Sequence, residues 1–285
     1  APTHRAMRRM LEICDNFATE FSVVFNAKKS KCMYFAPSVR RLMQARASKL
    51  PLQFSIAGQP IAFVDEWLHL GHTISVTCDD RSEIMKKRSM LCGQINSVLC
   101  FFSKRDPIIK LSLLKSYCSS FYGCVLWDLS HSCINDFCVI WRKGLRRVWD
   151  LPHNTHSNLL SPLCGSLPLM DEISCRNAQF IGNCLKSDCE IVNFIARHGV
   201  YFSRMLSPIG RNAQFCSSRF SISLNDIGTV TKNLVWAHVR SNLSLSILYS
   251  VMSLLELLFI KFRYFTLPLF SFSDIEKAIN ALAAC

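Results

Sequence analysis

Apolar residues at the beginning of the chain recur with the period of an amphipathic helix. Between residues 2 and 19 the spacing is carried by Met7, Met10, Leu11, Cys14, Phe17 and Ala18. A helix of 3.6 residues per turn places these side chains on one face, and three arginines lie among them. The pattern therefore predicts a helix over residues 2–19.

After this helix the apolar runs become short and their period falls to about two residues, which is typical of strands. Short strands are predicted over residues 21–25 and 33–35, and a β-hairpin is predicted over residues 52–64. The residues Ala57-Gly58-Gln59-Pro60 supply the turn of that hairpin. A further strand over residues 67–75 is broken at Gly71. The arginine-rich run 38–49 is predicted to be a basic loop or helix.

Beyond Ser75 the period returns to about 3.6 residues. Asp79 and Asp80 can cap a helix whose apolar face runs from Ile84 to Phe102. The pair Asp106-Pro107 suits the start of a second helix, which is expected to continue to Val125. Further helices are predicted over residues 137–149, 169–185 and 190–198, and polar loops are predicted over residues 203–228.

This order of elements predicts an α+β fold. A small α/β part with a β-hairpin, residues 1–78, is followed by a mainly helical part, residues 79–228. An apolar tail of unassigned role covers residues 229–285. The chain opens at Ala1 without an initiator methionine, so we interpret it as an excerpt or a processed product.

The formal net charge is +13 at neutral pH. A surplus of this size favours a polyanionic partner, either nucleic acid or an acidic membrane surface. Residues 241–285 contain equal numbers of cations and anions, so residues 1–240 carry the whole excess. Half of the chain is hydrophobic, which is typical of a folded protein and argues against disorder.

Two basic clusters lie beside aromatic residues. Lys104 and Arg105 follow two phenylalanines, and the run 141–149 contains four further cations. Within that run Trp141, Leu145, Val148 and Trp149 form an apolar helical stripe, and the cations that fall mostly off it are Arg142, Lys143, Arg146 and Arg147. Such a face is either simply solvated or tracks phosphates, and the global charge favours phosphates.

Candidate metal sites have simpler interpretations. Asp79-Asp80 resembles a paired-carboxylate ligand, but carboxylates at a helix start are favoured as caps. The 15 cysteines include two Cys-x4-Cys spacings, 133–138 and 184–189, without any Cys-x2-Cys or zinc-finger order. Most cysteines fall on apolar faces, so we expect reduced thiols inside a cell, in the cytoplasm and nucleus, and no metal site.

The apolar stretch 243–270 is interrupted by three charged residues and a proline. Its uncharged part, residues 241–255, is shorter than the roughly 20 residues that a bilayer helix needs. A buried helix is therefore favoured over a membrane span, and a segment foreign to the native protein is a third alternative. A membrane partner is not expected.

Several stretches resemble the reverse transcriptases of non-LTR retrotransposons, the LINE type, particularly the chicken-repeat and Jockey-like group. Residues 25–32 (FNAKKSKC) resemble the Asn-x-x-Lys-Ser/Thr motif at the end of the palm. Residues 67–74 (WLHLGHTI) resemble the Tyr-Leu-Gly primer grip, with His69 where Tyr is usual. Residues 114–127 and 141–156 resemble the thumb signature. The motifs occur in family order over residues 1–212, with weaker support as far as Gly228.

The resemblance implies a fragment of an RNA-directed DNA polymerase. Its partners would be an RNA template, a DNA primer, and the remaining palm and fingers of the full-length protein. The family's Tyr-x-Asp-Asp box would come just before Ala1, so Mg²⁺ is expected for the full-length enzyme and no cofactor for this fragment, which is predicted inactive alone.

The resemblance also suggests roles for individual residues. Lys29 would protonate the pyrophosphate as a general acid, and the alternative is a surface lysine without that role. Leu70, Gly71 and His72 would press on the primer backbone. The thumb would hold the duplex through phosphates, using the cations Arg88, Lys104, Arg105, Arg142, Lys143, Arg146 and Arg147. The competing hypothesis is a non-enzymatic basic helical module that binds nucleic acid or a membrane surface.

Overall fold

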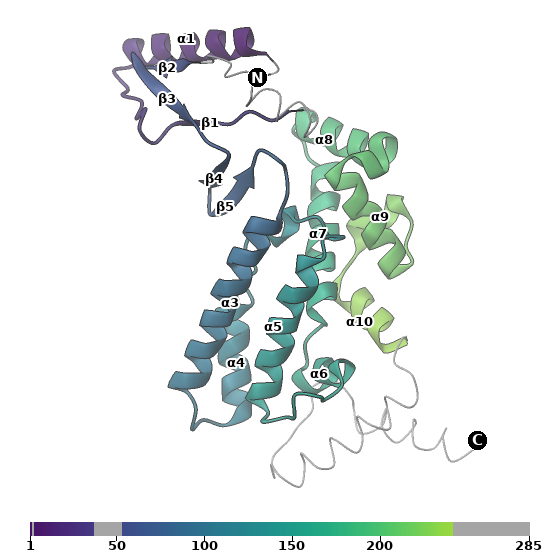
Figure 1. The fold of residues 1–285 in the computed structure, drawn as a ribbon. Coiled ribbons are helices and arrows are strands. Elements are labelled where there is room, and N and C mark those ends of the chain that lie inside the picture. Colours follow the sequence, from purple (N-terminus) through teal and green to yellow (C-terminus); the bar gives the residue numbers. More distant parts are fainter. Residues whose placement is uncertain (2, 37–52, 242–285) are drawn as a thin grey trace, which may run out of the picture. The chain divides into compact units, whose positions relative to one another are not determined.

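The computed structural model describes residues 1, 3–36 and 53–241 (Figure 1). Its described part is a mixed α/β structure in which helix predominates, which agrees with the predicted fold class at that level. The chain divides into two compact units between Glu83 and Ile84, a few residues beyond the predicted boundary after residue 78. The basic run 38–49 and the tail beyond Ser241 lie outside the described residues.

The first unit contains one helix on a small sheet. Helix α1 (His4–Glu20) begins at Thr3, whose hydroxyl accepts a hydrogen bond from the backbone N–H of Ala6 at 3.1 Å. The sheet has the strand order β1-β3-β2, with β1 parallel and β2 antiparallel to β3. Its strands are β1 (Lys31–Cys32), β2 (Phe54–Ile56) and β3 (Gln59–Phe63).

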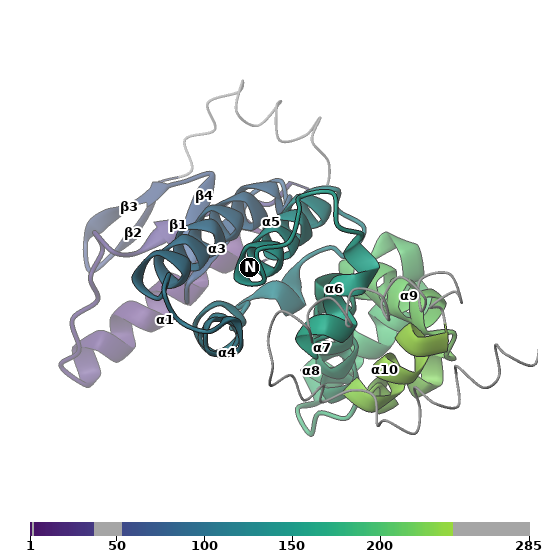
Figure 2. The ribbon, with the colours of Figure 1, turned by 90° about the horizontal axis from the view of Figure 1, so that it is seen from below.

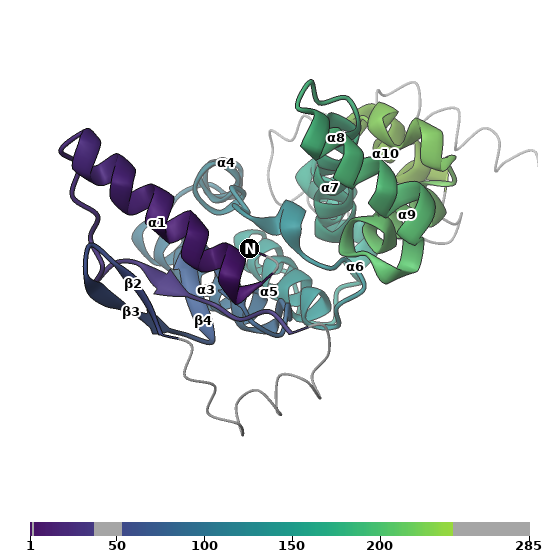
Figure 3. The ribbon, with the colours of Figure 1, turned by 90° about the horizontal axis from the view of Figure 1, so that it is seen from above.

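Helix α1 packs against β2 through a small apolar cluster (Figure 3). The Asp15 carboxylate also accepts a hydrogen bond from the backbone N–H of Ala57 at 2.8 Å. The buried residues of this cluster are Ala27, Cys32, Phe54, Ile56 and Ile61, with Met7, Leu11, Cys14 and Phe25 packed against them. Met7, Leu11 and Cys14 of the predicted helix pattern therefore face the core, whereas Met10 and Phe17 are exposed.

Two predicted strands are wrong. Residues 21–25 form a turn and an exposed segment after α1, because Phe21 and Val23 donate backbone hydrogen bonds back to that helix. Residues 33–35 are also irregular, and only Lys31–Cys32 pairs with β3. A strand needs a ladder partner as well as an apolar run, and these two segments lack one among the described residues.

The predicted hairpin over residues 52–64 is confirmed, with a shorter turn. Only Ala57 and Gly58 form the turn, with φ of 51° and 71°, while Gln59 and Pro60 belong to β3. The strand predicted over residues 67–75 is instead a second hairpin. Its antiparallel strands are β4 (Glu66–His69) and β5 (His72–Ser75).

The second unit is helical, and α7 lies at its centre, in contact with α5, α8, α9 and α10 (Figures 1 and 2). The helices and shorter turns are α3 (Arg81–Phe101, which begins in the first unit), α4 (Pro107–Cys118), η1 (Cys124–Leu126), α5 (Cys133–Val148), α6 (Ser157–Cys164), α7 (Leu169–Leu185), α8 (Glu190–Arg197), η2 (His198–Ser203), η3 (Arg204–Leu206), α9 (Pro208–Phe220), η4 (Leu224–Thr229) and α10 (Lys232–Ser241).

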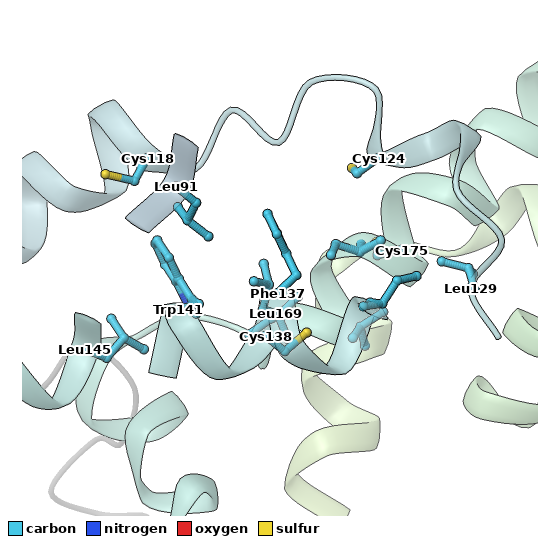
Figure 4. Packing of buried hydrophobic residues seen from close by; sticks show 14 of the residues in the cluster. Leu91, Cys118, Cys124, Leu129, Phe137, Cys138, Trp141, Leu145, Leu169 and Cys175 are labelled. Atoms are coloured by element: carbon cyan, nitrogen blue, oxygen red, sulfur yellow. The ribbon is translucent and has the colours of Figure 1, made fainter. Parts of the chain in front are cut away.

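A group of aromatic rings packs together within the mostly aliphatic core of this unit. Phe137 lies edge-on to Trp127 with ring centroids 5.2 Å apart, and Phe121 lies edge-on to both Phe137 and Trp141. Figure 4 shows these α5 side chains pointing into one cluster with Leu145 and Cys138. Burial of these rings adds to the stability that the aliphatic residues of the same cluster provide.

Helix α4 begins as predicted but ends early. The Asp106 carboxylate caps it by accepting a hydrogen bond from the N–H of Ile108 at 2.7 Å, and Pro107 occupies the first turn. The helix stops at Cys118 rather than Val125, because the Arg176 guanidinium binds the carbonyls of Ser119 and Ser120 beyond its end. The chain then turns through positive φ at Phe121 and Gly123.

The loops predicted over residues 203–228 are wrong, since α9 spans Pro208–Phe220. The polar side chains of α9 form hydrogen bonds and an ion pair within the helical unit. Asn212 is buried and bonds the carbonyl of Trp127 and the N–H of Leu129, and Arg211 pairs with Asp128 at 2.9 Å. Burial works against ionisation of Asp128, but hydrogen bonds from Ser130 and the Arg211 guanidinium hold its pKa below the usual value.

The tail predicted to begin at residue 229 starts inside this core. Val230 and Val235 are buried, and α10 contacts α7. Residues 229–241 therefore belong to the helical unit.

Candidate nucleic-acid interface

The predicted apolar stripe on α5 is confirmed. Trp141, Leu145, Val148 and Trp149 are all buried. On the rest of the helix Lys143 and Arg147 are exposed, whereas Arg142 and Arg146 are half-buried. The helical period thus presents two cations to solvent and holds two nearer the core.

Arg146 has a structural task. Its guanidinium donates to the carbonyl of Thr155 from Nε at 3.1 Å and from Nη2 at 2.7 Å, and Nη2 also donates to the Ser157 hydroxyl. These bonds tie the end of α5 to the turn that leads into α6. Arg146 therefore has fewer N–H groups left for a phosphate than sequence position alone suggests.

Arg147 joins α5 to α3. Its Nη1 donates to the Asn96 side-chain carbonyl at 2.6 Å. One turn earlier Gly144 lies against Ile95, and a Cβ there would stand 3.0 Å from the Ile95 side chain. The two helices therefore pack closely, and the exposed residues Lys143 and Arg147 stand beside that line of contact.

The cations predicted on and after α3 differ in exposure. Arg88 is half-buried, and its Nε has no hydrogen-bond partner within the described part of the chain. Lys104 and Arg105 follow the end of α3 and are exposed. The prediction omitted two further cations near the start of the same helix, Lys86, which is exposed, and Lys87, whose ammonium lies 5.5 Å from the Tyr122 ring centre. Both lysines directly precede Arg88 in the sequence, and this run of three cations could have identified them as candidates.

The turn of the second hairpin, in the first unit, holds a leucine in the left-handed backbone region. Leu70 has φ of 48° and Gly71 has φ of 77°, which is the pattern of a tight hairpin turn with both central residues left-handed. Glycine adopts this conformation freely, but leucine does so at a cost of roughly 1–2 kcal/mol. The Leu70 side chain is 77% exposed. A strained, exposed leucine at a turn is a feature associated with function.

The strand residues that follow this turn are held by Glu83, in the first turn of α3. Glu83 is 1% exposed, and its Oε2 accepts a hydrogen bond from the backbone N–H of Thr73 at 2.9 Å. Its Oε1 lies 3.5 Å from His72 Nδ1. The structure therefore places His72 against Glu83, while Leu70 and Gly71 form the tip. Sequence reasoning missed Glu83, because nothing in the local pattern shows that Thr73 and His72 lie beside it.

Lys29 lies in a turn that the preceding asparagine organises. The Lys29 N–H is shared between the side-chain and backbone carbonyls of Asn26, at 3.1 Å to each. Ala27 is buried beneath the turn, and the Lys29 side chain is exposed. Nearby in the sequence, the Lys31 ammonium lies 5.8 Å from the Trp67 ring centre, which connects β1 with β4.

Metal ligands do not gather in the described residues, where no group of three or more His, Cys, Asp or Glu side chains forms. The Asp79 carboxylate accepts the N–H of Arg81 at 3.0 Å, in agreement with its interpretation as a helix cap. Many cysteines are buried as small apolar residues, and burial raises the pKa of the Cys164 and Cys216 thiols to about 12.

Comparison with protein-family models, curated proteins and solved structures found no significant match to this chain. Among the helices of the described part, none has the length and apolar character needed to cross a bilayer.

Proposed function

We propose that the chain is the C-terminal palm and thumb portion of a LINE-type RNA-directed DNA polymerase, and that it binds the RNA–DNA hybrid of template and primer. The observation that carries the proposal is the strained Leu70-Gly71 turn, whose following strand residues are held by Glu83 on the first turn of α3. This turn immediately precedes a basic helical unit, in the order in which the sequence motifs occur.

The hairpin turn suits contact with a nucleic-acid backbone. Gly71 has no Cβ, so a sugar–phosphate chain can approach its backbone closely. Leu70 offers an exposed apolar side chain beside it. His72 acts indirectly in this proposal, because its contact with Glu83 positions the strand that follows the turn.

The cations of the helical unit suit phosphates rather than bases. Lys143 and Arg147 are exposed side by side on α5, and Lys104 and Arg105 are exposed after α3. Lysine and arginine on a helix surface read the charge and spacing of a duplex but carry little sequence information. Arg146 supports this surface by ordering the turn before α6.

Catalysis requires groups that this sequence does not contain. The sequence has no Tyr-x-Asp-Asp box, so the carboxylates that anchor two Mg²⁺ ions in the family would come from the remaining palm. Lys29 is exposed and can serve as the general acid for the leaving pyrophosphate in that complete enzyme. We expect the 285-residue chain alone to give no primer extension with Mg²⁺ or Mn²⁺.

The proposal is tested by fluorescence anisotropy with a labelled RNA–DNA hybrid and the full chain. Replacing Lys143 and Arg147 with Gln should weaken binding at least tenfold at 100 mM salt, because two phosphate contacts are lost. The matched control replaces Lys186 and Arg240, which are also exposed, and removes the same charge. An equal loss in both variants would mean that only net charge matters and that α5 is no specific surface.

A second measurement distinguishes this proposal from the competing hypothesis of a helical module that binds membrane surfaces. The full chain should not float with anionic phosphatidylserine vesicles under conditions in which it binds the hybrid. Flotation without hybrid binding would overturn the polymerase proposal in favour of that module.

A further inference from the structure

Helix α8 and the turns after it expose an apolar surface instead of burying it. Of the α8 side chains, only Ala196 is buried. The large apolar residues exposed on this surface are Ile191 at 71%, Phe194 at 69%, Ile195 at 59%, Phe202 at 77%, Met205 at 58% and Leu206 at 89%. Figures 1 and 3 show α8 at the margin of the helices around α7. A gathering of large exposed apolar residues within one short segment, residues 191–206, is typical of a binding surface.

Three rings on this surface form a ladder. The Phe194 and His198 ring centres are 6.1 Å apart, and those of His198 and Phe202 are 5.7 Å apart. Each pair is inclined by only 20°. The rings therefore present their edges and outer faces in one row, four residues apart along the chain.

A change of helix type keeps the rings in line. Four residues of an α-helix turn the chain slightly more than once, so a ladder of every fourth residue drifts around the axis. At His198 the backbone passes into η2, which has the wider turn of a π-helix and corrects the drift in the opposite sense. Single π turns are uncommon and occur frequently at functional sites.

The π turn is locked by close backbone packing. The Ser207 hydroxyl donates to the Gly199 carbonyl at 3.0 Å and accepts from the Gly210 N–H at 2.9 Å. A Cβ at Gly199 would collide with the Ile209 side chain, and one at Gly210 would collide with the carbonyls of Gly199 and Arg204. The ladder is thus held in place before any ligand binds, which lowers the entropic cost of binding.

We propose that the ladder of Phe194, His198 and Phe202 is a platform on which unpaired nucleic-acid bases stack. The outer faces and edges of this row of rings, set on a rigid backbone, offer the stacking surface that sequence-tolerant binding of single strands uses. Arg197 and Arg204 are exposed and lie within two residues of His198 and Phe202 in the sequence, and each uses its Nε for a local bond to a neutral carbonyl, Asn193 and Tyr201 respectively. A backbone phosphate can be held by their outer N–H groups.

The platform lies on elements other than the α5 surface proposed for the hybrid, so the two can be tested separately. The net charge of +13 favours a polyanion over a neutral protein partner. An apolar protein partner or a second copy of this chain would instead rely on the aliphatic residues of the same surface, such as Ile191 and Leu206.

The experiment measures binding of a labelled 15-nucleotide oligouridine and of an RNA–DNA hybrid to the full chain. The double variant Phe194→Leu/Phe202→Leu retains apolar area but removes two ring faces. We expect it to bind the single strand at least tenfold more weakly, since stacking on each ring contributes roughly 5- to 100-fold. Hybrid affinity should stay within about twofold of the parent if the hybrid uses α5.

Rescue and control variants sharpen the result. Phe194→Tyr/Phe202→Tyr should restore single-strand affinity, because the ring faces return. Ile191→Ala/Leu206→Ala, at equally exposed aliphatic positions, should leave it unchanged. Photo-crosslinking with 4-thiouridine in the oligonucleotide should label the peptide that covers residues 190–206.

Three outcomes would overturn the platform. The first is unchanged oligouridine binding in the leucine variant, and the second is an equal loss in the aliphatic control. The third is a protein that light scattering shows to dimerise, or that floats with anionic vesicles, and that no longer does so in the aliphatic variant. Each assigns the surface to another occupant, whether or not the chain binds the hybrid.

Discussion

Helices α5 and α8 are both amphipathic and both pack on α7, yet they turn opposite faces to it. Helix α5 buries its aromatic stripe and exposes cations, whereas α8 buries Ala196 and exposes Phe194 and two isoleucines. A periodic pattern therefore establishes that a helix has two unlike faces. Which face meets the core depends on the space that neighbouring helices leave.

That space is set by residue size at the contact. On α5 the large rings of Phe137 and Trp141 face the core and fill the space beside the neighbouring helices. At α8 the buried residue is an alanine, and the following turn brings Gly199 and Gly210 into close contact. Small residues allow the backbone of this segment to lie close to its neighbours. The large apolar side chains of α8 then remain exposed to solvent.

The largest expected effect is a fall in the free energy of unfolding at alkaline pH. It comes from buried thiols of the core and does not involve the α8 surface. Burial raises the pKa of Cys164 and Cys216 from 9.0 to about 12 and that of Cys124 and Cys138 to about 11. The folded state then holds protons that the unfolded state releases above pH 9, so stability is full below that pH and falls as pH rises.

Each such thiol should cost about 1.4 kcal/mol per pH unit above 9. Lys115, whose pKa is lowered by burial, acts in the opposite direction but is a single half-buried group. Urea unfolding at pH 8, 9 and 10 measures the effect, and Cys164→Ala/Cys216→Ala should reduce the slope, since Cys124 and Cys138 still contribute. The same pH dependence in that variant would show that other groups titrate.

The exposed Cys189, beside α8, should be alkylated at pH 8 while Cys164 resists.

Alanine at matched phenylalanines tests the opposite orientation of the two helices. Phe137→Ala on α5 should reduce the free energy of unfolding by about 3–5 kcal/mol, because a 2% exposed ring in contact with Trp127 is lost. Phe194→Ala on α8 should change it by less than about 0.5 kcal/mol. Thermal or urea melts compare the two, and similar losses would mean that α8 is buried in solution.

Two cations of α5 should separate stability from binding. Arg146→Gln loses bonds to Thr155 and Ser157 and should cost about 1–2 kcal/mol of stability at this half-buried position. Lys143→Gln should cost less than about 0.5 kcal/mol and reduce hybrid affinity. A stable Arg146 variant with weakened binding would show that Arg146 contacts phosphate directly.

The smallest effect concerns the two tight turns. Leu70→Asn should raise stability by up to about 1 kcal/mol, because asparagine tolerates a left-handed backbone better than leucine. Ala57→Asn, in the other hairpin with φ of 51°, should do the same. Only the Leu70 variant should weaken hybrid binding. If both or neither weaken it, the Leu70 tip has no special role.

Periodicity predicted most of this architecture because most helices here follow the simple rule of one apolar face. It anticipated the caps at Asp79 and Asp106 and the buried stripe of α5. Periodicity gave the wrong element where distant hydrogen-bond partners determine the local structure. Helix α9 reads as a loop because Asn212 and Arg211 are polar, and nothing local reveals that Trp127 and Asp128 bind them.

The candidate surfaces show the same division. The cations of α5 were visible in the sequence, but the engagement of Arg146 and Arg147 by Thr155 and Asn96 was not. Likewise, Gly71 predicted a break in the strand, whereas the hydrogen bond from Thr73 to Glu83 became visible only in the structure. The ring ladder depends on a π turn, which side-chain periodicity at 3.6 residues does not represent.

The most direct test of the proposed hybrid surface is the salt dependence of hybrid affinity for the parent chain and for the Lys143→Gln/Arg147→Gln variant. Each phosphate contact contributes a slope of roughly −0.7 to −0.9 in log K against log salt. The parent should show a steep slope, and the variant should be shallower by about 1.4 to 1.8. Parallel lines for the two proteins would contradict the claim that α5 holds the duplex through its phosphates.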